Sequence, residues 1–263
     1  MGSEQVANEI DFGKTASDYV QHREGFPPAL LSRLQPYAIG QSGQSILDIG
    51  TGTGTLARQF ALQGAHVSGL DVASELIEQA KMLDQQAGTW VDYHVGSAEE
   101  LPFADQSTDV ISAGQCWHWF NAAQVARECH RVLKPGGALV ICHFDWLPLT
   151  GNMVELTESL ILKHNPNWSM AGGSGLYPRW LSDVATEGFE HLETFSFDCT
   201  IPYSHEGWRG RIRASAGISA SLSPTQVDAF DEEHQTALAA KFVNDPMEIP
   251  HRVWALIARK AWS

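Results

Sequence analysis

The sequence predicts an α/β protein built on a doubly wound, mostly parallel seven-stranded sheet with an α-helical lid insertion. Three observations support this expectation. Short apolar runs alternate with helical patterns from residue 45 to residue 146, the first run ends in a glycine-rich bend, and two strand-like runs follow much later. A chain of 263 residues, 43% of them hydrophobic, is long enough for one such core with an appended lid.

The expected elements follow the rhythm of a parallel sheet covered by helices on both faces. Strands are expected over residues 46–49, 66–70, 91–95, 109–114, 138–143, 189–200 and 251–260. Helices are expected over residues 53–62, 75–83, 122–133, 153–163, 179–187, 206–214 and 224–242. Residues 11–34 are expected to form a helical or irregular arm, because Phe26-Pro27-Pro28 breaks a helix.

No internal repeat or linker divides this pattern, so we expect one domain with insertions. The expected parts are an N-terminal arm or lid (1–40), a ligand-binding core (41–146), a lid insertion (147–187), and the last core strands (188–263) with a helical insertion at 204–245. These boundaries follow from where the strand–helix rhythm stops and resumes.

The balance of charges argues against a nucleic-acid partner. The formal net charge is -14, and a chain so acidic lacks the basic face that supplies most affinity for DNA or RNA. A small-molecule partner is favoured instead. No apolar run approaches the length of a membrane span, and the polar start of the sequence lacks a signal-peptide core. We therefore expect a soluble, cytoplasmic protein that is a monomer or a homodimer.

The cysteines are widely spaced and include no Cys-x-x-Cys pair, which argues against a zinc site or a disulfide framework. They are Cys116, Cys129, Cys142 and Cys199. We expect reduced thiols that pack as small hydrophobic groups, and no metal.

The glycine-rich bend is the most informative segment of the chain. Residues 46–54 read Ile-Leu-Asp-Ile-Gly-Thr-Gly-Thr-Gly, an apolar strand followed by alternating glycines. Glycine suits a turn with positive φ and lets a ligand lie against the main chain. A pyrophosphate site would present G-x-G-x-x-G to the ligand, but the third position past Gly52 is Thr55, and the acidic Asp48 precedes the loop. A carboxylate there repels phosphate and suits the cationic ammonium and sulfonium of S-adenosylmethionine.

Residues at the ends of the next two strands fit the nucleoside half of this ligand. Asp71 closes the second strand about 20 residues after the loop, where a carboxylate can accept hydrogen bonds from both ribose hydroxyls. Ser97 and Ala98 form a small-residue turn after the third strand, where adenine can lie against the backbone. Structural alternatives stay open. Asp48 can cap the glycine turn, and Asp71 can cap the next helix, although Ser74 is better placed for that role.

Several motifs occur in the order and spacing of one family: Asp48–Gly54, Asp71, Gly96–Phe103, Asp109 and Arg131–Gly137. Together they resemble the class I S-adenosylmethionine-dependent methyltransferases, including the type 11 methyltransferase domain, most strongly over residues 15–145. The resemblance implies a Rossmann-like sheet whose seventh strand lies antiparallel beside the sixth, with S-adenosylmethionine as cofactor. We interpret Lys134-Pro135-Gly136-Gly137 as a structural helix stop before the fifth strand.

The end of the fourth strand, Gly114–Phe120, is similar to small-molecule methyltransferases of the trans-aconitate methyltransferase type. Tyr19 and Arg23 support this likeness, although Arg23-Glu24 departs from the usual Arg-Pro pair. The resemblance implies a small-molecule acceptor. The expected cofactor-binding residues are Tyr19, Arg23, Asp48, Gly50, Thr51, Gly52, Asp71, Val72, Ser97, Ala98 and Gln115. The expected acceptor-binding residues are Trp117, Trp119, Trp146 and Arg211.

His118 is the expected catalytic residue, because the unperturbed pKa of histidine suits proton removal near neutral pH. It can also orient the acceptor or simply pack, and a carboxylate acceptor would need no base. In an extended segment, His118 faces away from Trp117 and Trp119. Either His118 or the two tryptophans can then face the ligand, but not both, unless the strand has already ended.

Arg209, Arg211 and Arg213 stand out in so acidic a chain. Such a run is typical of a solvated helix face. The sharper hypothesis is that one or more of them binds an anionic acceptor through paired hydrogen bonds.

Three other functions stay open at the level of sequence. A nicotinamide-dependent oxidoreductase would use a similar sheet, but Asp48 and Thr55 count against it. A methyltransferase acting on a macromolecule, RNA or protein, is the rival within the class. A non-catalytic S-adenosylmethionine-binding module is the third, and the intact glycine loop favours an active enzyme over it.

Overall fold

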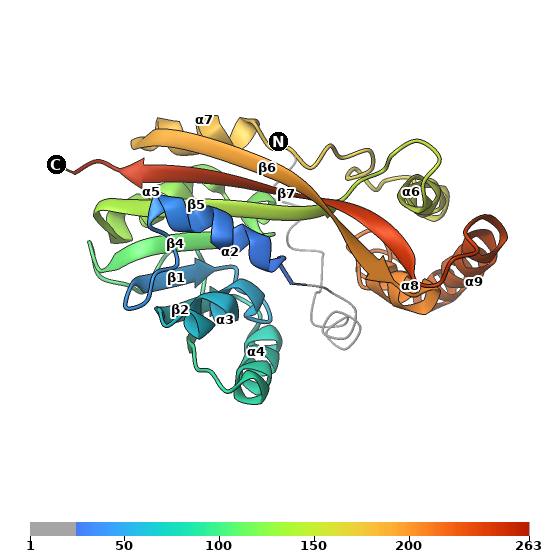
Figure 1. Cartoon of the computed structure of the whole chain (residues 1–263), viewed down its shortest axis with the longest axis horizontal. Helices are drawn as coiled ribbons and strands as arrows, with labels where there is room; N and C mark the ends of the chain where they lie inside the picture. Colours follow the sequence, from blue (N-terminus) through green and yellow to red (C-terminus); the bar gives the residue numbers. More distant parts are fainter. Residues whose placement is uncertain (1–24, 263) are drawn as a thin grey trace. The chain divides into compact units, whose positions relative to one another are not determined.

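The computed structural model describes residues 25–262 and contains a seven-stranded sheet (Figure 1). The strands are β1 (Ser45–Ile49), β2 (His66–Asp71), β3 (Asp92–Val95), β4 (Thr108–Gly114), β5 (Leu133–Trp146), β6 (Phe189–Tyr203) and β7 (Met247–Lys260). Their order in the sheet is β3-β2-β1-β4-β5-β7-β6. The pairs from β3 to β5 are parallel, and the β7 arrow runs against those of β5 and β6. The predicted doubly wound, mostly parallel seven-stranded sheet is confirmed.

Each strand and helix that the sequence predicts between residues 45 and 260 is present, with its ends shifted by a few residues. Before the sheet, the described part of the arm contains α2 (Pro28–Leu34). Pro28 is the first residue of this helix, a position where the missing N–H of proline costs nothing. The two prolines therefore start a helix here, and the earlier part of the arm lies outside the described residues.

The described residues form two compact units, which we call the sheet unit and the helical unit. The sheet unit comprises residues 25–143, 177–196 and 253–262, and the helical unit comprises residues 144–176 and 197–252. The helix α7 (Arg179–Thr186), expected at the end of the lid insertion, belongs to the sheet unit, because Trp180 and Val184 pack in its core.

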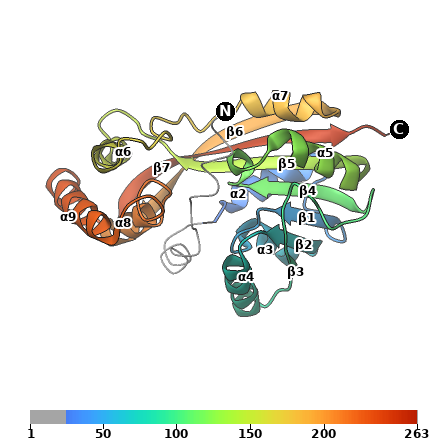
Figure 2. The same ribbon diagram turned by 180° about the vertical axis from the view of Figure 1, so that it is seen from behind.

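Helices cover both faces of the sheet unit. They are α2, α3 (Thr55–Leu62), α4 (Ser74–Ala87), α5 (Ala122–Val132) and α7. Figure 1 shows α2 in front of the strands, and Figure 2, turned by 180°, shows α5 in front of them. Accordingly, four consecutive residues of β4, from Val110 to Ala113, are buried, as expected for a parallel strand with no solvent-facing side.

The helical unit has its own hydrophobic core. It contains α6 (Met153–His164), α8 (His205–Arg213) and α9 (Pro224–Lys241). Trp208 and Phe230 are fully buried in this core, and the indole N–H of Trp208 donates to the Thr157 hydroxyl at 3.0 Å. Across residues 25–262, none of the helices combines the length and the apolarity that a membrane crossing requires.

Helix α4 starts differently from the expectation. Ser74 is its first residue and Ala73 is the N-cap. The carbonyl of Ala73 accepts from the N–H groups of Leu76 and Ile77. The interpretation of Ser74 as the cap was therefore wrong, because the turn after β2 is one residue shorter than the cap required.

Residues 134–137 belong to β5 itself rather than to a helix stop that precedes it. The pairing of β4 with β5 is irregular between Thr108 and Val110, which accommodates this extension. Asp109 holds the region together, because its carboxylate accepts from the Lys134 ammonium at 2.7 Å and from the Ser45 N–H at 2.8 Å. One carboxylate thus connects β1, β4 and β5.

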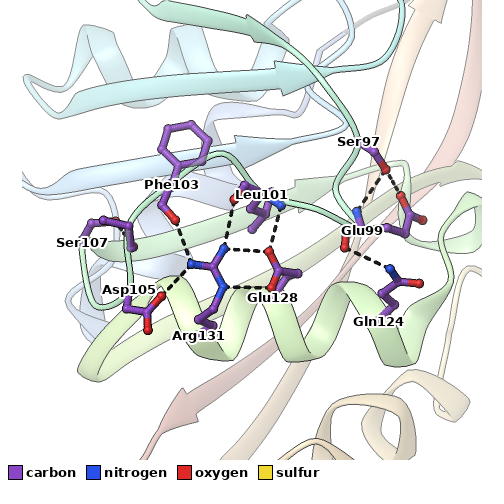
Figure 3. A network of polar contacts seen from close by, with 10 residues as sticks. Ser97, Glu99, Leu101, Phe103, Asp105, Ser107, Gln124, Glu128 and Arg131 are labelled. Atoms are coloured by element: carbon purple, nitrogen blue, oxygen red, sulfur yellow. Dashed lines mark hydrogen bonds and ion pairs between the residues drawn. The ribbon is translucent and has the colours of Figure 1, made fainter.

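The connection between β3 and β4 is an irregular loop that polar contacts from α5 hold in place (Figure 3). The Arg131 guanidinium donates to the carbonyl oxygens of Leu101 (3.0 Å) and Phe103 (2.9 Å). It also pairs with Asp105 and Glu128, both at 2.7 Å, and Glu128 accepts from the Leu101 N–H at 2.9 Å. Because these contacts reach backbone atoms, Arg131 and Glu128 set the path of the loop.

We expect Arg131→Ala to lower the free energy of unfolding by about 1–3 kcal/mol, because it leaves two partly buried carbonyl groups without donors. The control is Arg127→Ala on the same helix. Its side chain is 60% exposed and makes an ion pair with Glu187 at 3.1 Å, so its loss should cost less than about 1 kcal/mol. Urea denaturation of both variants measures the difference, and equal losses would show that the loop does not depend on Arg131.

Candidate functional site

The glycine-rich bend connects β1 to α3 and is attached to the neighbouring strand. Gly50 and Gly52 have φ angles of 59° and 55°, in the left-handed region that favours glycine. A Cβ atom at Gly50 would lie 2.7 Å from the Cβ of Cys116, which is too close for any side chain. The N–H of Thr51 donates to the carbonyl of Leu70 in β2 at 3.0 Å. The sequence of the bend therefore follows from its backbone geometry.

Asp48 lies beneath the bend and is 2% exposed. Its carboxylate accepts from the hydroxyls of Thr51 (2.7 Å) and of Ser112 in β4 (2.6 Å). Burial raises the pKa of Asp48 to about 6, the two hydroxyl hydrogen bonds oppose this rise, and the nearby Asp71 carboxylate adds to it. In the structure, Asp48 thus connects the bend to β4 through two hydroxyl groups, and its contact with a ligand stays a prediction.

Asp71 joins the end of β2 to the bend. One carboxylate oxygen accepts from the Gly52 N–H at 2.8 Å, and the other accepts from the Ala73 N–H at 3.0 Å. Burial raises the pKa of Asp71, and these backbone hydrogen bonds oppose the rise. The next residue, Val72, is 71% exposed. The structure thus brings together several of the residues that were predicted to bind the cofactor.

The turn after β3 lies beside Asp71, because the Gly96 N–H donates to the Asp71 carbonyl at 2.9 Å. Within the turn, the Ser97 hydroxyl donates to the Glu99 carboxylate and accepts from the Glu99 N–H at 3.2 Å (Figure 3). The side chain of Ala98 is 4% exposed and packs in the core of the sheet unit. Glu99 therefore shapes this turn, a role that the sequence did not reveal.

The segment after β4 is a short 3-10 helix, Trp117–Trp119, so the alternation expected for an extended strand does not apply. Trp117 is 1% exposed and lies in the core of the sheet unit, and this burial argues against a contact with an acceptor. Trp119 is only partly buried against the same core. Gln115 has a left-handed φ of 63°, and its N–H donates to the Cys142 carbonyl at 2.9 Å.

The structure pairs His118 with a residue to which the sequence pattern did not point. The Nδ1 atom of His118 lies 3.2 Å from the Nε2 atom of His143 in β5. The register explains the pairing, because Gly114 of β4 lies opposite Cys142 of β5. The available signal was a histidine near the end of each of two adjacent parallel strands, since such strand ends share one edge of a sheet.

His143 is enclosed by aromatic rings. It is 3% exposed, and its ring centroid lies 4.4 Å from that of Tyr177 and 5.0 Å from that of Trp180. Tyr177 and Trp180 stack on each other at 4.0 Å with an interplanar angle of 8°. His118 is more exposed, and its ring lies 4.4 Å from that of Trp119.

In the helical unit, Trp146 and Arg211 lie together. The Arg211 guanidinium is 5.0 Å from the centroid of the Trp146 ring, which is a cation–π contact. Arg209 and Arg213 make ion pairs with Asp231 of α9 instead. Two of the three arginines that stood out in the sequence thus connect α8 with α9.

The other predicted positions can be placed briefly. Tyr19 and Arg23 lie outside the described residues. Within the described part of the chain, no group of three or more His, Cys, Asp and Glu side chains is arranged to hold a metal ion. The cysteines that the structure describes are free thiols.

The raised pKa of Asp48 has a consequence for stability. Between the ordinary value of 3.8 and about 6, the folded protein keeps the Asp48 proton and the unfolded chain loses it. Because the folded state binds more protons, the contribution of Asp48 to stability falls as the pH rises through this range and is constant above it. We expect the free energy of unfolding of the wild type, relative to Asp48→Asn, to decline over the same range. Urea denaturation at intervals of pH tests this, with exposed Asp92→Asn as control, and parallel profiles would refute it.

Comparison with known proteins agrees with this geometry. Residues 47–141 match a protein family described as a methyltransferase domain. The match begins in β1 and ends in β5, so it includes Asp48, Asp71 and His118.

Two relatives show how far the likeness extends. An uncharacterised methyltransferase of Mycobacterium tuberculosis is 32% identical over 130 residues, which are 49% of this chain and 50% of that protein. A ubiquinone biosynthesis O-methyltransferase of Xylella fastidiosa is 28% identical over 194 residues, which are 71% of this chain and 76% of that protein. The chain thus spans about half the length of the Mycobacterium relative.

A solved structure shares the fold. Phosphoethanolamine N-methyltransferase 2 of Haemonchus contortus, in complex with phosphomonomethylethanolamine and S-adenosylhomocysteine, superposes with a TM-score of 0.58 at 20% identity. The likeness covers 96% of this chain and 60% of that one. At this identity the likeness shows the fold alone. The order of the strands and the family match agree with the predicted class I S-adenosylmethionine-dependent methyltransferases: residues 47–141 of the chain are a methyltransferase domain.

Proposed function

We propose that the protein transfers a methyl group from S-adenosylmethionine to a small-molecule acceptor. One observation carries the proposal: two carboxylates, Asp48 and Asp71, are tied to the same glycine bend. Their hydrogen-bond partners among the described residues are hydroxyl and backbone N–H groups rather than cationic side chains. The two carboxylates and the glycine backbone of the bend together form an acidic surface. Such a surface suits a cationic nucleoside and repels a pyrophosphate.

Each part of the cofactor has a matching position in this proposal. Asp71 accepts hydrogen bonds from the ribose hydroxyls, and the bend at residues 50–52 lies against the methionine end above Asp48. The turn at Ser97 and Ala98 borders the adenine. Val72 supports this arrangement, because an apolar side chain that is 71% exposed beside Asp71 can pack on a bound ring.

Methyl transfer is an in-line displacement in which the C–S bond breaks as the new bond forms and the sulfur keeps the electron pair. The protein contributes mainly by alignment, which can supply about 7–11 kcal/mol. His118 is the proposed base for acceptors whose attacking atom carries a proton. Residues 147–187 and 200–245, with the N-terminal arm, are the proposed lid that selects the acceptor.

The acceptor is proposed to be anionic, and Arg211 with Trp146 is proposed to bind it. The planar guanidinium can stack on the indole and still direct paired N–H donors toward a carboxylate or phosphate. A hydrogen bond fixes the orientation of the Trp146 ring, because its indole N–H donates to the Glu158 carboxylate at 2.8 Å. The net charge of -14 supports a small molecule over a nucleic acid.

The proposal is tested by incubating the protein with a labelled methyl donor and a metabolite pool, and by identifying labelled products by mass. A labelled small acid would support it. Label found only in RNA or protein, or tight binding of a nicotinamide cofactor with no binding of S-adenosylhomocysteine, would refute it.

We expect Asp71→Ala to weaken S-adenosylhomocysteine binding by about 1.5–3 kcal/mol, the range for hydrogen bonds to a charged group. Titration calorimetry measures the change. Asp92→Ala is the control, because it removes the same charge from the neighbouring strand β3 at a side chain that is 53% exposed. Wild-type affinity in Asp71→Ala would remove the ribose assignment.

We expect Arg211→Ala to raise the acceptor KM about tenfold or more and to leave S-adenosylhomocysteine affinity unchanged, because a charge-assisted hydrogen bond is lost. Arg209→Ala is the matched comparison on α8. It breaks the ion pair with Asp231, so it should lower thermal stability instead. The assignment of Arg211 fails if its variant has a wild-type KM.

A further inference from the structure

A second histidine, His143, lies beside His118, the proposed base. We propose that His143 is a positioning residue that fixes the tautomer of His118, so that the Nε2 atom of His118 carries the lone pair that accepts a proton. This inference rests on the proposed function and adds a residue to its chemistry. The geometry that supports it is the 3.2 Å separation between Nδ1 of His118 and Nε2 of His143.

A hydrogen bond between two imidazole rings couples their tautomers, because one nitrogen must donate and the other must accept. If Nδ1–H of His118 donates, its Nε2 atom is an acceptor and can work as a base. If His143 donates instead, Nε2 of His118 carries a proton and has no basic lone pair. The identity of the donor therefore decides whether His118 can take a proton at all.

His143 is built as a fixed partner. Its ring is 3% exposed and lies against Tyr177 and Trp180. Those two rings are themselves held by Trp254 of β7, at centroid distances of 5.7 Å and 5.6 Å. Because these aromatic side chains pack against it, the His143 ring is held in one orientation. His118 is more exposed and adjusts to His143, as expected for a base supported by a residue behind it.

The proton balance of the proposed step is complete. The acceptor atom attacks the methyl carbon, the C–S bond breaks, and its electron pair stays on the sulfur of S-adenosylhomocysteine. The proton of the acceptor moves to Nε2 of His118. The resulting imidazolium donates from Nδ1 to Nε2 of His143, which stabilises the positive charge, and the proton then leaves to solvent.

Nitrogen NMR tests the tautomer without any acceptor. In protein labelled with 15N-histidine, two-bond correlation spectra at about pH 8 distinguish the two neutral tautomers, and His118→Gln assigns the His118 signals. We expect the Nδ1–H form at His118 in the wild type. We expect the Nε2–H form, which free histidine favours, in His143→Phe, which keeps a ring but cannot accept.

Two variants control this result. His143→Gln supplies a side-chain oxygen that can accept, so it should keep the Nδ1–H form and stands in if His143→Phe does not fold. His130→Phe changes a histidine on α5 that contacts Phe189, and it should leave the His118 signals unchanged. The proposal is overturned by an Nε2–H tautomer at His118 in the wild type, or by an unchanged Nδ1–H form in His143→Phe.

Kinetics with the acceptor found by labelling gives a second readout. His143→Phe should lower kcat about 100-fold or more, the usual contribution of a general base, with KM within about threefold of wild type. His143→Gln should restore most of this loss. An unchanged kcat in His143→Phe would overturn the inference. A protein that forms no methylated product counts against the proposed function instead, because the NMR result does not depend on turnover.

Discussion

The hydrogen bonds that hold the glycine bend constrain the rest of the site. The Asp71 carboxylate accepts from Gly52, and the Asp48 carboxylate accepts from Thr51, so the bend is fixed from the ends of two neighbouring strands. The left-handed backbone at Gly50 brings the bend so close to Cys116 that no Cβ fits. Because parallel strands end at one edge of a sheet, the turn after β3 and the segment after β4 lie at the same edge as this bend.

Much of the fold and part of the site could be predicted because their signals are local. The bend, the apolar run of β1 and the spacing to Asp71 lie within about thirty residues and depend on backbone chemistry alone. The His118–His143 pair could not be predicted in the same way, because it depends on the register between β4 and β5 and on where β4 ends. Whether Trp117 packs in the core or faces a ligand could not be decided from the sequence for the same reason, because it depends on the 3-10 helix that follows β4.

The arginines of α8 show how a helix separates residues that the sequence presents as equivalent. Positions 209 and 213 are four residues apart and share one helix face, whereas position 211 is turned away from both. Asp231 of α9 accordingly pairs with Arg209 and Arg213, and Arg211 lies over Trp146. Once the helix is assigned, its periodicity predicts two structural arginines and one with a different partner.

Because Asp48 is buried, the charge of a ligand bound beside it would change the pKa of its carboxyl group. A carboxyl group with a pKa near 6 is ionised at neutral pH, at the cost of a buried charge that two hydroxyl hydrogen bonds offset only in part. A cation bound against the bend would stabilise the ionised form and lower that pKa, so binding and ionisation would favour each other. An anionic phosphate would have the opposite effect, because it would force the carboxyl group to take up a proton before it could approach. If a ligand lies against the bend as proposed, the buried charge of Asp48 would therefore favour a sulfonium nucleoside over a dinucleotide.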